Sequence, residues 1–185
     1  MNKIKILPDE VINQIAAGEV LDRPSSAVKE LVENSIDANS KKISIFVRDG
    51  GKAEIVVIDD GNGISKQELE LAVTRHATSK LNEKKIDALS FLGFRGEALP
   101  SIGSVSEMII KSNTDNDQDG MMIEVISGIK KKIRPVNHRK GTTVSVKKLF
   151  FSTPARLKFL KTDNYESLLI KRIVQKLALC NFHID

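Results

Sequence analysis

The chain has 185 residues, 41% of them hydrophobic and 29% charged, which is typical of one folded globular domain. No apolar run approaches the roughly 20 residues of a membrane span, and Met1–Pro8 lacks the apolar core of a secretory signal. The single cysteine, Cys180, excludes an internal disulfide framework and a multi-cysteine zinc site, so we expect a reduced, cytoplasmic protein. The net charge of +5 is compatible with a nucleic-acid partner but does not require one.

Two helices are predicted near the N-terminus, over Val11–Val20 and Ser25–Ala38. The break between them falls at Arg23-Pro24, and Ser25 is a residue type that caps helix N-termini. The apolar residues of the second segment fall on one face, which predicts that it packs on a sheet.

A hairpin is predicted next. Ile43–Val47 alternates apolar and polar residues, as a half-buried strand does, and Glu54–Ile58 is a more continuously apolar strand. Asp49-Gly50-Gly51 between them has the composition of a turn.

The following region is predicted to contain one short helix and a long mobile segment. Ser65 and Glu68 form a capping box that starts a helix running to about Thr74. From Arg75 to Ser104, glycines and polar residues break the periodicity, which indicates an irregular, mobile stretch.

The last part of the chain is predicted to form strands and then a helix. The expected strands are Val105–Lys111, Met121–Ile126, Lys131–Pro135 and Thr142–Lys147. Tyr165–Leu179 is expected to be a helix whose apolar stripe contains Leu168, Leu169, Ile173, Val174 and Leu177. Helices followed by mixed strands favour a two-layer α/β sandwich of the α+β kind over a parallel sheet. The residues after Ala178 are similar to a helix passing into a new strand, so we expect a fragment of a longer protein.

Three acidic or amide residues share one face of the second predicted helix. Glu30, Asn34 and Asp37 are spaced by four and then three residues. A carboxylate beside an amide suits ATP hydrolysis, with glutamate as general base for water and asparagine as an oxygen ligand of Mg²⁺. An ordinary amphipathic helix with a solvated polar face has the same spacing, so both interpretations stay open.

Two glycine-containing segments could bring the backbone close to a ligand. Asp59-Asp60-Gly61-Asn62-Gly63 follows a buried strand, where a carboxylate can accept hydrogen bonds from an amino group. Gly93-Phe94-Arg95-Gly96-Glu97-Ala98-Leu99 runs into a predicted helix start, whose N–H groups suit phosphate. A tight turn and a plain loop-to-helix junction are the respective alternatives.

Other ligand motifs are excluded. No G-x-x-x-x-G-K-[ST] sequence occurs, and Gly61-x-Gly63 lacks the third glycine of the dinucleotide fingerprint. Asp115-x-Asp117-x-Asp119-Gly120 matches the start of a calcium-binding EF-hand loop, but Ile126 stands where the bidentate glutamate belongs. We interpret that stretch as a solvated loop.

The order of these motifs resembles the GHKL superfamily of ATPases, which includes gyrase, histidine kinases and the MutL proteins. The matching series is Glu30/Asn34, Asp59-x-Gly61-x-Gly63, Gly93–Leu99 and Gly141-Thr142-Thr143. Within that superfamily, five stretches are similar to signatures of the MutL family of DNA mismatch repair proteins: Gln14–Val20, Lys29–Ala38, Arg75–Lys80, Gly93–Leu99 and Thr153–Leu160.

The resemblance implies a GHKL sandwich, with helices on a mixed, mostly antiparallel sheet, and a site for ATP and Mg²⁺. It implies Glu30 as the general base, Asn34 as the Mg²⁺ ligand and Asp59 as the acceptor for the adenine amino group. The residues expected to bind the nucleotide are Asn34, Asp37, Asp59, Gly61, Gly63, Thr78, Ser79, Lys80, Arg95, Gly96, Leu99 and Thr143. Thr78–Lys80, Arg95, Gly96 and Leu99 would belong to a lid and its phosphate contacts.

The resemblance also implies an ATP-dependent switch that couples mismatch recognition to downstream excision, with slow hydrolysis. The expected partners are ATP, DNA at a basic surface, a mismatch-recognition protein of MutS type, and a downstream repair helicase or endonuclease. The full-length protein is expected to be a homodimer in the cytoplasm, associated with the nucleoid in a bacterium.

Residues 1–185 are expected to form the N-terminal ATP-binding domain, ending as the following subdomain begins. Because the family's phosphate-contacting lysine and its C-terminal dimerisation domain would lie beyond these residues, we expect weak ATP binding and slow hydrolysis from this chain. The alternatives are another GHKL ATPase, such as a topoisomerase subunit, and a non-catalytic DNA-binding or scaffold fragment.

Overall fold

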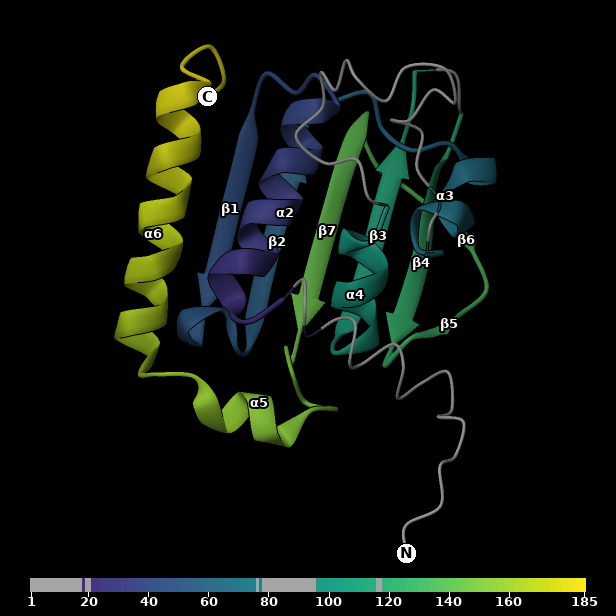
Figure 1. Ribbon diagram of the computed structural model, residues 1–185. Helices are drawn as coiled ribbons and strands as arrows, with labels where there is room; N and C mark the ends of the chain where they lie inside the picture. The colour runs from purple at the N-terminus through teal and green to yellow at the C-terminus, as the bar shows by residue number, and fades with distance from the viewer. Residues whose placement is uncertain (1–17, 19–20, 76, 78–95, 116–117) are drawn as a thin grey trace, which may run out of the picture.

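A computed structural model of the chain describes residues 18, 21–75, 77, 96–115 and 118–185. In this part of the chain, seven strands form one sheet, and helices α2, α4 and α6 lie over the same face of it (Figure 1). The two-layer sandwich predicted from the sequence is therefore confirmed. Every pairing between described strands is antiparallel, so the mixed character expected of the sheet is not observed.

The elements follow the chain in a simple order. The helices are α2 (Pro24–Asp37), α3 (Lys66–Ala72), α4 (Ala98–Ser104), α5 (Pro154–Phe159) and α6 (Asp163–Cys180), with a 3₁₀ turn at Asp49–Gly51. The strands are β1 (Ile43–Arg48), β2 (Glu54–Asp59), β3 (Glu107–Asn113), β4 (Gly120–Ile126), β5 (Ile129–Lys130), β6 (Arg134–Val136) and β7 (Gly141–Lys147). Their order in the sheet is β1-β2-β7-β3-β4-β5, and β6 also pairs with β4.

The predicted hairpin forms one end of the sheet, with β1 as the edge strand. β1 and β2 pair in register, with Ile45 opposite Val57. In β2, Ile55 and Val57 are almost fully buried, because successive strand residues point to opposite faces and these two point toward the helices. Burial of this face in one hydrophobic core fixes the register of the strands.

Helix α2 begins one residue earlier than expected and is not capped by serine. Its N-cap residue is Arg23, and Pro24 occupies the first helical position, so the prediction of Ser25 as the cap is wrong. Proline is favoured there because its fixed φ suits the helix and its missing N–H would have no partner. The capping box of Ser65 and Glu68 at the start of α3 is confirmed.

The predicted irregular segment from Arg75 to Ser104 is wrong at its C-terminal end, because α4 occupies Ala98–Ser104. Pro100 stands in the first turn of this helix, where proline is tolerated. Gly103 lets the helix approach the sheet, since a Cβ there would lie 2.9 Å from a methyl group of Val125. The predicted helix Val11–Val20 lies outside the described residues except for Gly18.

The edge strand and the last helix also differ in detail from the prediction. In place of a strand at Lys131–Pro135, two short strands, β5 and β6, pair with β4. Both are largely exposed, so no burial pattern marks their limits. Helix α5 was not predicted.

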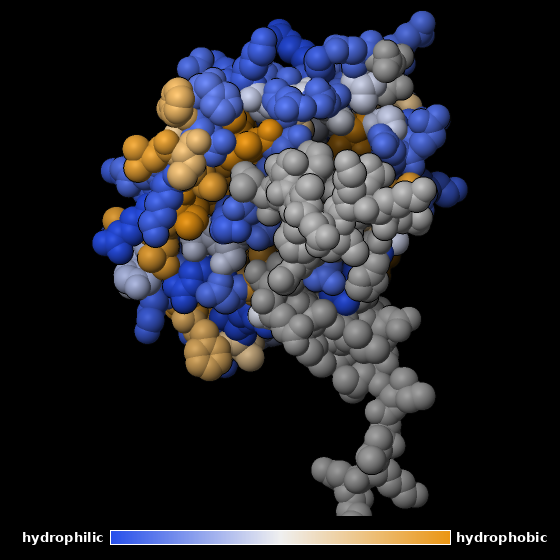
Figure 2. Space-filling view, turned by 45° about the horizontal axis from the view of Figure 1, so that its top comes forward, coloured by the Kyte–Doolittle hydropathy of each residue, from blue (hydrophilic) through white to orange (hydrophobic). Residues whose placement is uncertain are grey.

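Helix α6 packs on α2 and the 3₁₀ turn, and most of its predicted stripe is confirmed, because Ile173, Val174 and Leu177 pack against the core. Ile170 and Glu166 are buried, whereas Leu168 is 43% exposed, so its assignment to the buried stripe is wrong. Hydrophobic side chains remain visible on the side of the molecule where α6 lies (Figure 2). No described helix is both long and apolar enough to cross a membrane.

Replacing Gly141 by alanine should destabilise the fold at the point where β7 meets β2. Gly141 has a φ of 109°, and a Cβ there would lie 2.0 Å from the backbone oxygen of Asp59. Gly128 also has a positive φ, 84°, but its nearest neighbour would be 3.8 Å away. We expect Gly141→Ala to lower the free energy of unfolding in urea by at least about 2 kcal/mol more than Gly128→Ala, which measures backbone strain alone. Equal losses in the two variants would contradict this.

Candidate functional site

A buried carboxylate lies at the end of β2. Asp59 is only 8% exposed, and its Oδ1 accepts hydrogen bonds from the backbone N–H groups of Gly61 (3.0 Å) and Thr142 (3.2 Å). The hydroxyl of Ser35, on α2, donates to Oδ2 at 2.8 Å. Burial raises the pKa of Asp59 above its ordinary value, and the hydrogen bonds from these three residues oppose that shift.

The neighbouring aspartate, Asp60, has a lowered pKa and a structural role. The carboxylate of Asp60 accepts from the backbone N–H groups of Lys41 (2.8 Å) and Lys42 (2.9 Å). The bond from Lys42 is the main cause that lowers the pKa of Asp60. Asp60 therefore stays ionised and ties the end of β2 to the turn before β1. Asp59 is the member of the pair that is buried beside α2.

The glycines after Asp59 are required by close backbone contacts. A Cβ on Gly61 would lie 2.7 Å from the carbonyl oxygen of Ala38, and the N–H of Asn62 donates to that same oxygen at 2.8 Å. Gly63 has a φ of 74°, and a Cβ there would lie 2.0 Å from the carbonyl oxygen of Asn113. The loop is thus packed between the C-terminal end of α2 and the end of β3. This packing brings the motif on α2 close to the motif that follows β2.

Ser112 holds this loop to the sheet. Its side chain accepts from the N–H of Ile64 at 2.8 Å, donates to the carbonyl oxygen of Gly141 at 3.0 Å, and lies 2.9 Å from the hydroxyl of Thr142. Ser112 is 1% exposed. One buried hydroxyl therefore connects β3, β7 and the glycine loop.

Thr142, and not Thr143, is the threonine of β7 that lies beside Asp59. Asp59 pairs with Thr142 across the β2–β7 ladder, whereas Thr143 pairs with Ile58 and so points to the other face of the sheet. There the hydroxyl of Thr143 lies 2.8 Å from Nε2 of His138. Thr143 was among the residues expected to bind the nucleotide, and the structure places it on the face opposite Asp59, because a shift of one residue along a strand reverses the face.

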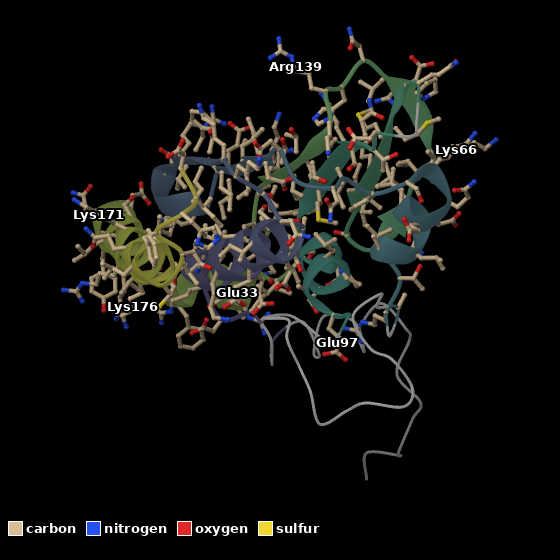
Figure 3. All side chains as sticks on the ribbon, turned by 90° about the horizontal axis from the view of Figure 1, so that it is seen from above. Glu33, Lys66, Glu97, Arg139, Lys171 and Lys176 are labelled. Carbon is tan, nitrogen blue, oxygen red and sulfur yellow. The ribbon has the colours of Figure 1, made fainter. Side chains whose placement is uncertain are left out.

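The acidic and amide residues of α2 are half-buried. Glu30, Asn34 and Asp37 lie on the flank of α2 next to the buried face that carries Ser35. The carboxylate of Glu30 lies 3.5 Å from the ammonium of Lys29, which also donates to Glu33 at 2.7 Å. Figure 3 shows Glu33 on the side of α2 away from the sheet.

The expected lid is described only at its two ends. Gly96 has a φ of 61°, and a Cβ there would lie 2.4 Å from the carbonyl oxygen of Ala77, so these two positions are in contact. Leu99 packs against the hydrophobic core. The expected site residues Thr78, Ser79, Lys80 and Arg95 lie outside the described residues.

The donors of the described site suit a magnesium ion only in combination with phosphate. No group of three or more histidine, cysteine, aspartate or glutamate side chains in the described ranges could hold a metal ion. Mg²⁺ in nucleotide sites often takes one or two protein oxygens and completes its octahedron with phosphate oxygens and water. Asn34, one helical turn after Glu30 on α2, is the residue expected to make that limited protein contribution.

Sequence reasoning missed Ser35, Ser112 and Thr142. All three are polar residues at inward-facing positions. Ser112 continues the buried alternation of Met108 and Ile110 in β3. Ser35 lies one helical turn after Leu31, on the core face of α2. A polar residue in phase with a buried stripe was the available signal, because such a group is buried only where it has a hydrogen-bond partner.

Comparisons with known proteins agree with this geometry. Residues 23–147 match the family model described as histidine kinase-, DNA gyrase B-, and HSP90-like ATPase. The chain is 49% identical over 182 residues to the DNA mismatch repair protein MutL of Rickettsia bellii (strain OSU 85-389), covering 98% of this chain and 30% of that protein. It is 50% identical over 181 residues to MutL of Agrobacterium fabrum, with the same coverage of 98% and 30%. The chain therefore spans about a third of the length of these relatives.

Two solved structures have the same fold. The Aquifex aeolicus MutL ATPase domain complexed with ADP superimposes with a TM-score of 0.74 at 33% identity, covering 89% of this chain and 58% of that one. The N-terminal domain of a DNA repair protein superimposes with a TM-score of 0.78 at 32% identity, covering 94% of this chain and 50% of that one.

Replacing Asp59 by asparagine should leave the fold at least as stable. The Oδ1 atom would still accept from Gly61 and Thr142, and the new amide could donate to Ser35, whose hydroxyl also lies 3.2 Å from the carbonyl oxygen of Leu31. Because the folded-state pKa of Asp59 is raised, its protonated form favours the folded state, and that contribution is lost as pH rises through the raised value. Urea unfolding of both proteins between pH 4 and pH 8 should show the variant gaining relative stability with rising pH. A variant that becomes relatively less stable over this range would contradict the burial of a charged carboxylate.

Proposed function

This chain belongs to the histidine kinase-, DNA gyrase B- and HSP90-like ATPase family, in its MutL branch, and we propose that it is the nucleotide-operated switch of a DNA mismatch repair protein. The observation that carries the proposal is the buried, hydrogen-bonded carboxylate of Asp59 beside the acidic and amide flank of α2. This arrangement offers a strong acceptor at one end of the site and groups for phosphate chemistry at the other.

Asp59 supplies the recognition of adenine. A carboxylate has about four acceptor positions, and Ser35, Gly61 and Thr142 donate to Asp59, so capacity remains for a further donor such as an amino group. The glycines next to it let the loop pack against the backbone at Ala38 and Asn113, which fixes Asp59 at the end of β2. Guanine carries a carbonyl oxygen where adenine carries the amino group, so an acceptor here favours ATP over GTP.

The polar flank of α2 supplies the hydrolytic chemistry. Asn34 would provide an oxygen ligand to Mg²⁺, and the metal, when bound, would neutralise charge on the phosphates. Glu30 would accept a proton from the water that attacks the terminal phosphorus, while the bond to the bridging oxygen breaks and ADP leaves with the electron pair. With the ammonium of Lys29 at 3.5 Å, the Glu30 carboxylate has a cation beside it.

The switch itself would arise from the segment between Ala77 and Gly96. Since these residues are in contact, both ends of that segment are anchored at one point next to α4. The terminal phosphate of ATP would order the segment through the expected lid residues Thr78, Ser79, Lys80 and Arg95, and hydrolysis would release it. In the full-length protein, this cycle would couple mismatch recognition to excision.

Several partners belong to the proposal for the full-length protein. They are a mismatch-recognition protein of MutS type, a downstream helicase or endonuclease, a second copy of the protein, and DNA. Because the chain spans about a third of its relatives, we propose that ATP binding by the chain alone is weak and hydrolysis slow.

The basic clusters give limited support to a purely DNA-binding function. Lys140 and Lys148 form ion pairs with Asp115 and Glu107, so part of the positive charge is neutralised. Exposed Lys131, Lys132 and Arg139 could contact a phosphate backbone. Salt-dependent DNA binding with no response to ATP in any assay would favour this second function.

Substitutions of Asn34 and Glu30 on α2 should have different effects, one on nucleotide binding and the other on the rate of hydrolysis. Asn34→Ala should weaken Mg²⁺-dependent binding of a non-hydrolysable ATP analogue at least about tenfold, because a metal ligand is lost. Glu30→Gln should keep the affinity within about twofold and lower single-turnover hydrolysis at least about 100-fold. Calorimetry gives the affinity, and phosphate release at excess protein gives the rate.

The matched control for these two variants is Asn164→Ala, which alters an exposed residue at the start of α6. It should bind and hydrolyse ATP as the unaltered chain does. Wild-type affinity in Asn34→Ala, or wild-type turnover in Glu30→Gln, would refute the assigned role of that residue.

Affinity for the ATP analogue should fall on acidification in a way that depends on Asp59. The adenine amino group requires the ionised carboxylate, and burial raises the pKa of Asp59, so the acceptor is lost at a higher pH than the ordinary value of about 4. Asp59→Asn should bind at least about tenfold more weakly at pH 8. The ratio of the affinity of the unaltered chain to that of Asp59→Asn should shrink as pH falls from 8 to 5. Taking the ratio cancels protonation of the phosphates, and a ratio that stays constant over this range would contradict the role of Asp59.

A further inference from the structure

The ammonium of Lys29 lies between two carboxylates of α2. It donates to Oε2 of Glu33 at 2.7 Å and to Oε1 of Glu30 at 3.5 Å. Lys29 and Glu33 are one helical turn apart, and Glu30 and Glu33 are three residues apart, so all three side chains meet on one patch of the helix surface.

Glu33 is buried although it lies on the side of α2 away from the sheet (Figure 3). Only 7% of Glu33 is exposed, whereas the side chain of Lys29 is 41% exposed. A buried carboxylate without a partner is strongly unfavourable, so Glu33 fixes the ammonium of Lys29. Partial burial lowers the pKa of Lys29, but its bond to Glu33 and the charge of Glu30 more than offset this, and the pKa is raised overall.

This ion pair differs from an ordinary pair on an exposed helix. A surface pair between neighbouring turns contributes little, because water solvates both partners and the side chains stay free to rotate. Here the carboxylate of Glu33 is almost fully buried, which limits where the ammonium can lie. The side chain of Glu30 is itself only 26% exposed, so a fixed cation beside it restricts its orientation.

We propose that Lys29, fixed by the buried carboxylate of Glu33, is a positioning residue that orients the Glu30 carboxylate toward the attacking water. The inference rests on the proposed role of Glu30 as general base. Lys29 also offsets the repulsion between Glu30 and Glu33, which would otherwise turn the Glu30 side chain away. In this arrangement Lys29 acts through Glu30, and its removal changes the hydrolysis rate rather than nucleotide affinity.

The experiment compares Lys29→Met with Lys29→Arg in the full chain. Lys29→Met should lower single-turnover hydrolysis of ATP about tenfold or more, with affinity for the non-hydrolysable analogue within about twofold. Lys29→Arg should keep the rate within about threefold, because a guanidinium can also bridge two carboxylates. Lys171→Met is the matched control, since Lys171 is an exposed lysine on α6, far from α2 Glu33 (Figure 3).

A double variant distinguishes positioning from a general loss of structure. The double variant Lys29→Met/Glu33→Gln removes the unpaired buried charge, so it should fold even if the single variant does not. It should remain slow, because Glu30 still lacks the cation that orients it.

The outcomes separate this inference from the function on which it rests. Wild-type turnover in Lys29→Met or in the double variant would overturn the role of Lys29 while leaving Glu30 as the base. An equal loss of affinity and turnover would place Lys29 on the nucleotide and also overturn it. No hydrolysis by the unaltered chain, or full hydrolysis by Glu30→Gln, would overturn the proposed chemistry of Glu30 and the positioning role together.

Discussion

The hydrogen bonds to the buried carboxylate of Asp59 are the constraint on which the site depends. A charge at 8% exposure is tolerated only where donors surround it, and here the donors come from α2, the glycine loop and β7. Each of these elements must therefore lie close to the end of β2. The glycines at positions 61, 63 and 141 follow from this requirement, because backbone atoms occupy the space that their side chains would need. The carboxylate that is costly to bury is also the group best able to recognise an amino group.

Much of this fold could be predicted from the sequence where burial imposes a period. The alternation in Ile43–Val47 and the continuous apolar run in Glu54–Ile58 correctly gave the β1–β2 hairpin. Prediction failed where burial imposes no periodic pattern on the sequence. The exposed strands β5 and β6 have no inward face to mark their ends, and α5 contains no buried residue. In α6 the stripe was misassigned at Leu168, because the helix packs along one flank beside the 3₁₀ turn and buries Glu166 in place of a leucine.

The sequence motifs associated Asp59 with the Gly141–Thr143 segment, and the structure brings these two together, with Thr142 rather than Thr143 beside Asp59. The order of the motifs pointed to Asp59 and to the Gly141–Thr143 segment, but no periodicity in two consecutive threonines says which one faces the helices. The register of β2 against β7 decides it, with Thr142 opposite Asp59. Ser35 and Ser112 were overlooked for a related reason. Each stands in a stripe of apolar residues, and only the three-dimensional network shows that its hydroxyl has partners there.

Helix α2 connects the two ends of the proposed chemistry. Ser35 on its core face bonds Asp59, and Glu30 lies five residues earlier, about 7.5 Å along the helix axis. Because Ser35 and Glu30 belong to one packed helix, the bond from Ser35 to Asp59 also fixes the backbone of Glu30 relative to Asp59. The two carboxylates to which we assign adenine recognition and water activation thus belong to one packed framework. The proposed switch requires such a framework, because bound nucleotide can bias another part of the protein only if the groups that hold its base and its phosphates keep their relative positions.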